Sequence, residues 1–166
     1  MSRLTRSEPD NPGVIALPPA IALATLAVGL VLDWLVPIGA ANAMLTRSWR
    51  FTLAAILFLM ACWIVFRAVR TFGRAGTPFD VRKAAVALAA DDIYAKTRNP
   101  MYQSLGLLLL ALAVGFASDW TALLLMPWAL VMHFGVVLRE EHYLEKKFGE
   151  EYRQYLRQVP RYGWPL

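Results

Sequence analysis

The stretch Arg98-Asn99-Pro100-Met101-Tyr102 stands where a polar connection ends and an uncharged run of 18 residues, 101–118, begins. After a turn at Ser118-Asp119, a second uncharged run, 120–138, follows. Each run is close to the roughly 20 residues with which a helix crosses the apolar core of a bilayer. The sequence therefore predicts two antiparallel membrane helices joined by a tight turn.

The far ends of such a hairpin must lie on the same side of the membrane. Counted outward from the turn at about 1.5 Å per helical residue, Arg98 lies level with Arg139. We therefore expect Asn99 and Tyr102 to lie within two helical turns of the acidic pair Glu140-Glu141, although about 40 positions separate the two segments. They should form one polar cluster at the membrane surface.

Two earlier uncharged segments, 11–32 and 51–66, raise the number of candidate spans to four in a chain of 166 residues. The hydrophobic share of 58% exceeds the roughly 45–50% of globular domains, so a soluble helical bundle is disfavoured. We expect an all-α integral membrane protein that forms a single domain, 1–166. The expected spans are about 13–36, 49–69, 101–118 and 120–138, and residues 139–166 should form a helical cytoplasmic tail that covers a cofactor.

The basic residues predict the orientation. Fifteen of the 17 Lys and Arg residues lie on one side if the N-terminus is inside the cell, which is the bias of cytoplasmic loops. Both termini and the Arg98 end should then face the cytoplasm of a bacterial inner membrane. This asymmetry and anionic membrane lipids explain the net charge of +5, so membrane lipids, and no nucleic acid, are the expected partners. Cys62 is the only cysteine, which excludes an internal disulfide.

Two further segments have a predictable local structure. The polar connection before Arg98 is too long to be structureless in a compact protein, and its alanine-rich stretch Val81–Ala90 predicts an interfacial helix between spans two and three. After the fourth span a helix should continue to Lys147, break at Phe148-Gly149 and be followed by a second helix, 150–158. The aromatic side chains of this tail favour its folding back onto the membrane face. Residues 1–12 show no periodicity and are expected to carry no chemistry.

The charged and polar residues near the expected hairpin ends are the candidates for chemistry. Glu140 and Glu141 would repel each other at a low-dielectric boundary unless cations or hydrogen-bond donors face them. His133 lies seven residues before Glu140, hence on the same helical face and level with Ser104 inside the bilayer. A histidine there is a functional candidate, and simple packing with a hydrogen bond to Ser104 is the alternative. No cluster has metal-ligand spacing and no Walker loop or nucleophile elbow is present, so no metal is expected.

Four sequence motifs follow one another along the chain and complete the pattern. They are the Gly73–Thr77 loop, Arg98-Asn99-Pro100-Met101-Tyr102, Glu140-Glu141 at the end of a hairpin, and Phe148-Gly149-Glu150-Glu151-Tyr152 followed by Val159-Pro160. On these motifs the chain resembles the integral-membrane methyltransferases of the isoprenylcysteine carboxyl methyltransferase and phospholipid methyltransferase superfamily. The resemblance covers about 72–160.

The resemblance implies a methyltransferase that uses S-adenosyl-L-methionine without a Rossmann domain and acts on a lipidic or apolar acceptor at the cytoplasmic membrane face. It places the cofactor among six residues, and three residues are candidates for handling the acceptor. The cofactor-binding candidates are Arg98, Asn99, Pro100, Tyr102, Glu140 and Glu141, and the catalytic candidates are His133, Arg139 and Glu140.

Two departures from the family pattern bear on the acceptor. Ser104 stands where the family commonly has glycine, and 133–138 lacks the arginine that prenylcysteine enzymes share about one turn before the acidic pair. A phospholipid amine, an isoprenylcysteine carboxylate and a small hydrophobic thiol all stay open. We expect the acceptor to enter from the bilayer past the inner half of span four and the end of span two. A small four-helix transporter or a structural membrane protein without catalysis is the alternative function.

Overall fold

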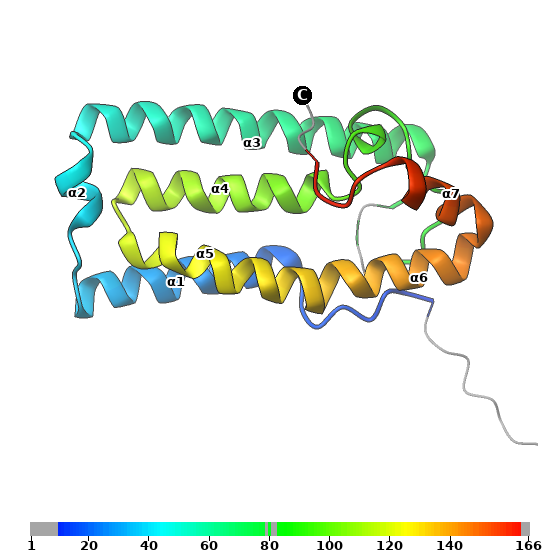
Figure 1. The fold of residues 1–166 in the computed structure, drawn as a ribbon, viewed down its shortest axis with the longest axis horizontal. Coiled ribbons are helices and arrows are strands. Elements are labelled where there is room, and N and C mark those ends of the chain that lie inside the picture. Colours follow the sequence, from blue (N-terminus) through cyan, green and yellow to red (C-terminus); the bar gives the residue numbers. More distant parts are fainter. Residues whose placement is uncertain (1–9, 79, 81–82, 164–166) are drawn as a thin grey trace, which may run out of the picture.

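The computed structural model describes residues 10–78, 80 and 83–163, and within these ranges the chain is helical, without strands (Figure 1). The elements are α1 (Pro18–Leu35), α2 (Ala40–Met44), α3 (Arg47–Ala75), the 3-10 turn η1 (Asp92–Ala95), α4 (Pro100–Phe116), α5 (Asp119–Met132), the π-helical turn η2 (His133–Val137), α6 (Leu138–Phe148) and α7 (Glu150–Gln158).

The long helices run side by side, with α4 between α3 and α5 and with α1 against α5 (Figure 1). Three of them are long and apolar enough to cross a membrane, namely Pro18–Leu35, Arg47–Ala75 and the continuous helix Asp119–Phe148, and Pro100–Phe116 is a shorter apolar helix. Large hydrophobic side chains remain exposed on their outer faces, as expected where lipid rather than water is the solvent. The protein is therefore an integral membrane protein whose helices cover the four expected segments.

One end of the bundle is closed by short connections and a polar network, which we call the turn end. Asp33 near the end of α1 accepts hydrogen bonds from the Ser118 hydroxyl and from the Trp120 amide, the latter at 3.2 Å. Asp119 caps α2, because its carboxylate oxygens accept from the amides of Ala40 and Ala41 at 2.9 Å each. These bonds attach α1 and α2 to the α4–α5 turn.

The expected interfacial helix at Val81–Ala90 is wrong within the described residues. Residues 83–90 have no helix, and residues 81 and 82 lie outside the described ranges. The amide of Ala85 donates to the Tyr143 hydroxyl at 3.1 Å, and that of Val86 donates to the Thr77 hydroxyl at 2.9 Å. Because side chains from other segments satisfy these donors, the alanine-rich stretch packs as an irregular segment in spite of its helix propensity.

The C-terminal tail has the expected two helices. Gly149 separates α6 from α7 and has a φ of 56°, which favours glycine. Tyr152 and Tyr155 on α7 are buried and pack with Val159. The tail thus folds back onto the bundle at the end opposite the α4–α5 turn, as Figure 1 shows in orange and red.

Candidate functional site

The motif before α4 is held by the C-terminal segment. Pro100 occupies the first turn of α4, where its missing N–H would have no helical partner anyway. The Arg98 amide donates to the Pro160 carbonyl at 3.0 Å, and the Asn99 side-chain amide donates to the Arg161 carbonyl at 3.2 Å. Thr97, which is fully buried, also contacts this carbonyl. The motif and the segment 160–163 therefore form one rigid unit.

The two adjacent glutamates of α6 have different partners. Tyr102 donates its hydroxyl to Glu140 at 2.6 Å, which confirms the apposition that the hairpin predicts. Both carboxylate oxygens of Glu141 accept from Arg161, at 2.8–3.1 Å from its Nε and Nη2 atoms, and Arg98 Nη1 lies 3.3 Å from Glu141 Oε1. The expected repulsion within the acidic pair is thus relieved by one phenol and two guanidinium groups.

Arg98 keeps a donor for a ligand. Its side chain and that of Glu141 are only 11% and 12% exposed, so the ion pair is largely removed from water. Two arginines share the Glu141 carboxylate here, while the adjacent Glu140 is held by Tyr102. The Arg98 Nε atom is buried and has no hydrogen-bond partner among the described residues, an arrangement that costs free energy unless another group satisfies the donor.

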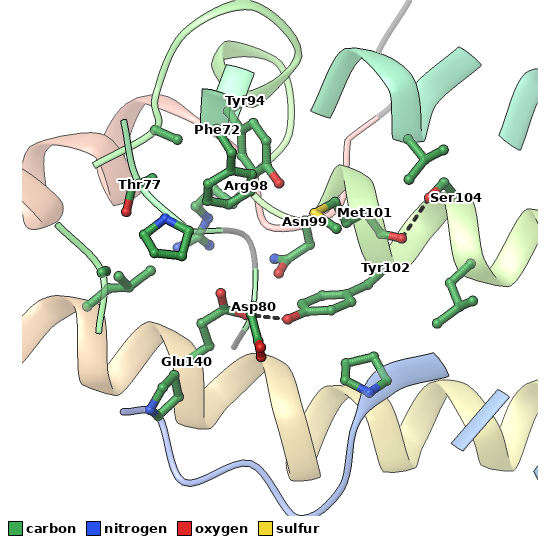
Figure 2. Close-up of a pocket in the computed structure, with 18 of the residues that line it drawn as sticks. Phe72, Thr77, Asp80, Tyr94, Arg98, Asn99, Met101, Tyr102, Ser104 and Glu140 are labelled. Carbon is green, nitrogen blue, oxygen red and sulfur yellow. Dashed lines mark hydrogen bonds between the residues drawn. The ribbon is translucent and has the colours of Figure 1, made fainter. Parts of the chain in front are cut away.

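A cavity of about 830 Å³ connects these residues with an apolar region between the helices (Figure 2). Its volume lies in the range of about 300–1,000 Å³ that is usual for small-molecule sites. The polar part is lined by Arg98, Asn99, Tyr102, Glu140, Glu141, Asp80 and Lys83, and the apolar part by Phe58, Ala61, Cys62 and Val65 of α3 and Leu105 and Leu108 of α4.

Aromatic residues enclose the polar part. Tyr94 on η1, with Tyr152 and Tyr155 on α7, lines the cavity, and Tyr155 donates its hydroxyl to the Tyr94 carbonyl at 2.7 Å. Burial raises the pKa of all three phenols, which therefore stay neutral. The turn η1 is in turn fixed to α3, because Asp92 pairs with Arg67, whose hydrogen bond lowers the pKa of that carboxyl.

Three candidates from the sequence do not line the cavity. Pro100 is buried at the start of α4. His133 Nδ1 contacts the Tyr162 hydroxyl at 2.8 Å, while Ser104 donates to the Met101 carbonyl, so the alternative of a hydrogen bond between His133 and Ser104 is not realised. Arg139 donates to the Gly13 carbonyl at 3.0 Å. The cavity brings together Arg98, Asn99, Tyr102, Glu140 and Glu141 from the predicted set.

Sequence reasoning missed several residues of the site. Arg161 directly follows the Val159-Pro160 motif, and its position beside an acidic pair two helices away was not visible from spacing. Tyr143 lies three residues after Glu140, on the same face of α6, and this periodicity could have indicated it. Phe72 lines the cavity from the last turns of α3, beyond the expected end of span two, and Tyr94 lines it from η1. No group of metal-ligating side chains occurs in the described ranges.

The fold and the site define a multi-span helical membrane protein with a cavity that is polar at one end and apolar between the helices. Comparison with known sequences gives the family: the phospholipid methyltransferase family matches residues 49–151, which is more than half of the chain and extends from α3 to the first turn of α7. The chain belongs to this family, as its motifs predict. Family membership implies methyltransferase activity with S-adenosylmethionine, and it speaks against the transporter and structural alternatives.

A further relative extends the comparison without assigning an activity. The chain is 42% identical over 62 residues to an uncharacterised protein of Haemophilus influenzae, and the match covers 37% of this chain and 98% of that protein. No solved structure matches the chain. The family match ends before most of α7, and it begins after residues 10–48, so the N-terminal helix and the C-terminal segment around Arg161 lie outside it.

Proposed function

We propose that this protein transfers a methyl group from S-adenosylmethionine to a lipidic or apolar acceptor at the cytoplasmic membrane face. The single observation that carries the proposal is the cavity itself. It joins the polar cluster around Tyr102 and Glu140 to an apolar part beside α3, so that one continuous space offers both a charged and a hydrophobic wall. This combination suits a polar cofactor next to an apolar acceptor.

The polar residues fit the chemical groups of the cofactor. Arg98 has a buried, unpaired Nε donor that suits a carboxylate. Glu140 presents a carboxylate that suits a cationic amino or sulfonium group, and Tyr102 holds it in place. Asn99 lines the same wall, Pro100 fixes the start of α4, and the buried tyrosines suit an adenine. Glu141 contributes by holding Arg98, because its oxygens already face two guanidinium groups.

Positioning is the main task of the protein in this reaction. Bound S-adenosylmethionine supplies a methyl group on a sulfonium, which reacts by in-line displacement without a covalent bond to the protein. Alignment and exclusion of water account for much of the acceleration in such a step, and the walls of the cavity supply both. We assign to Glu140 the role of accepting the proton that an amine or thiol acceptor loses. We give no chemical step to His133 and Arg139, which contact Tyr162 and Gly13 outside the cavity.

The exposed residues of the cavity wall indicate how the acceptor enters. Phe58 and Val65 on α3 line the cavity and are still 46% and 37% exposed, and Cys62 between them is also exposed. Leu17 and Pro18 at the start of α1 form the other wall, whereas no described residue of α5 lines the cavity. We therefore propose that the acceptor enters from the bilayer between α3 and the start of α1. This path keeps the expected passage beside span two and takes the place of the expected passage past span four.

A radiolabelled methyl-transfer assay with purified protein tests the proposal. The donor is S-adenosylmethionine with a labelled methyl group, and the acceptors are membrane lipid extracts, isoprenylcysteine analogues and small hydrophobic thiols. We expect label in at least one apolar acceptor and a loss of about ten- to a hundredfold in catalytic efficiency for Tyr102→Phe, because a hydrogen bond to a charged group contributes about 1.5–3 kcal/mol. Methylation of a water-soluble, charged acceptor alone would contradict lateral entry.

A further inference from the structure

Residues 10–17, which we call the N-terminal strap, run along η2 and α6 (Figure 1). Three contacts fasten them: the Ile15 amide donates to the Gly135 carbonyl at 3.2 Å, Arg139 donates to the Gly13 carbonyl at 3.0 Å, and Lys147 lies 2.7 Å from Asp10. The strap precedes the part of the chain that the family shares. The strap therefore lies outside the family match.

The strap packs closely against the π-helical turn η2. A Cβ atom at Gly135 would overlap the side chain of Ile15, so a larger residue there would force that side chain to shift. Turns of π-helix are often found at functional sites. Here the turn combines a carbonyl that accepts from the strap with the absence of a side chain at the same residue.

Tyr143 connects the strap with a second segment that covers the cavity. Its hydroxyl donates to Asp10 at 2.7 Å and accepts from the Ala85 amide at 3.1 Å and from Lys147 at 3.0 Å. A phenol has one donor and two acceptor positions, so all three are used. One side-chain atom of α6 thereby holds two segments that are about 75 positions apart in the sequence.

Both segments are walls of the cavity. Pro12 and Leu17 belong to the strap and line it, as do Lys83, Ala85, Ala87, Leu88 and Ala89 of the segment 83–90. Much of the remaining wall is formed by packed helices, whereas these two segments have no regular secondary structure. The Asp10 side chain is 61% exposed, and exposed ion pairs contribute little stability. The strap and the segment 83–90 are therefore the parts of the wall that can separate at the lowest free-energy cost.

We propose that Tyr143 is a positioning residue that fastens the strap and the segment 83–90 over the polar part of the cavity and thereby sets how fast a nucleoside cofactor or its product leaves. This inference rests on the proposed function, because it assigns the cavity to S-adenosylmethionine. It adds a role for residues outside the family match. Tyr143 acts through the two segments and takes no part in methyl transfer.

The rate at which S-adenosylhomocysteine dissociates from the purified protein tests the inference. Tyr143→Phe removes the hydroxyl and keeps the ring, and we expect dissociation about tenfold faster, since about one net hydrogen bond is lost at each segment. Tyr162→Phe is the matched control, because it removes a phenolic hydroxyl that contacts only His133 among the described residues, and it should dissociate at the wild-type rate.

Amide hydrogen exchange gives a readout that does not depend on the cofactor. In Tyr143→Phe, exchange should rise together in 10–17 and 83–90 and stay unchanged in α4. Gly135→Ala should raise exchange in the strap alone, and Ile15→Ala added to it should restore protection by removing the overlap. Unchanged dissociation and unchanged exchange in Tyr143→Phe would overturn the inference while leaving the methyltransferase proposal intact. A wild-type protein that binds no S-adenosylhomocysteine would overturn both.

Discussion

The two ends of the helical bundle carry similar residues, yet charged side chains line a cavity at only one of them within the described residues. At the turn end, Asp33 and Asp119 accept hydrogen bonds from a hydroxyl group and from backbone amides that would otherwise lack partners. At the opposite end, Glu140 and Arg98 face a cavity of about 830 Å³, and one arginine donor is unpaired. Acidic and aromatic residues at a membrane boundary are thus insufficient to indicate a site. The distinguishing feature is a large cavity lined by charged and polar side chains, because the smaller pocket near the turn end, of about 330 Å³, is lined by apolar residues and glycine.

The comparison first predicts that the two ends lie on opposite sides of the membrane. In a Cys62→Ser background, we expect Asn42→Cys at the turn end to react with a membrane-impermeant maleimide in intact spheroplasts. Lys146→Cys on α6 should react only after the membrane is made permeable. Both residues are exposed, so access to the thiol is limited only by the membrane. Reaction of Lys146→Cys in intact spheroplasts would contradict the positive-inside orientation.

At the end of the bundle opposite the turn end, Glu141→Leu should have the largest effect on stability. It leaves Arg98 and Arg161 without their shared carboxylate in a largely buried place. Removing one partner of a buried ion pair typically costs about 3–5 kcal/mol, which denaturant unfolding in detergent can measure. Glu145→Leu on the same helix is the control, because its pair with Arg153 is about half exposed and contributes about 0–1 kcal/mol. Equal effects of the two substitutions would mean that the Glu141 cluster is not effectively buried.

Asp33→Asn tests the turn end with a smaller expected loss. Weakened hydrogen bonds from Ser118 and Trp120 should lower the free energy of unfolding by about 1.5–3 kcal/mol. The affinity of the folded protein for S-adenosylhomocysteine should not change, because Asp33 is near the α4–α5 turn and does not line the cavity. A lower affinity together with unchanged unfolding would show that the two ends do not have separate roles.

Cys62 gives the smallest and most selective perturbation, because it is the only cysteine of the chain and lines the apolar part of the cavity. A membrane-permeant maleimide attached there should reduce methylation of apolar acceptors about tenfold or more, because the label would overlap with the acceptor. A tenfold reduction corresponds to about 1.4 kcal/mol. Binding of S-adenosylhomocysteine should stay within twofold of the unlabelled protein. Loss of both methylation and S-adenosylhomocysteine binding would place the cofactor, rather than the acceptor, beside α3.

The sequence predicted the parts of this structure that depend on length, periodicity and local stop signals. The four apolar segments, the break at Gly149 and the approach of Tyr102 to Glu140 follow from helix geometry alone. The stretch 83–90 was predicted incorrectly because its backbone donors bind Tyr143 and Thr77, and tertiary contacts of this kind override helix propensity. Arg161 and Asp10 were missed for a related reason: each contacts α6 from a segment without periodicity.

The binding affinity of S-adenosylhomocysteine for the purified protein in detergent, measured by isothermal titration calorimetry, tests the central claim most directly. Binding should be detectable in the wild type and should weaken about ten- to a hundredfold in Arg98→Met and in Glu140→Gln, because each loses an interaction with a charged group. Arg153→Met, which removes an exposed arginine from α7, should bind like the wild type. Wild-type affinity in both site variants, or no binding by the wild type, would contradict a cofactor site between α4 and α6.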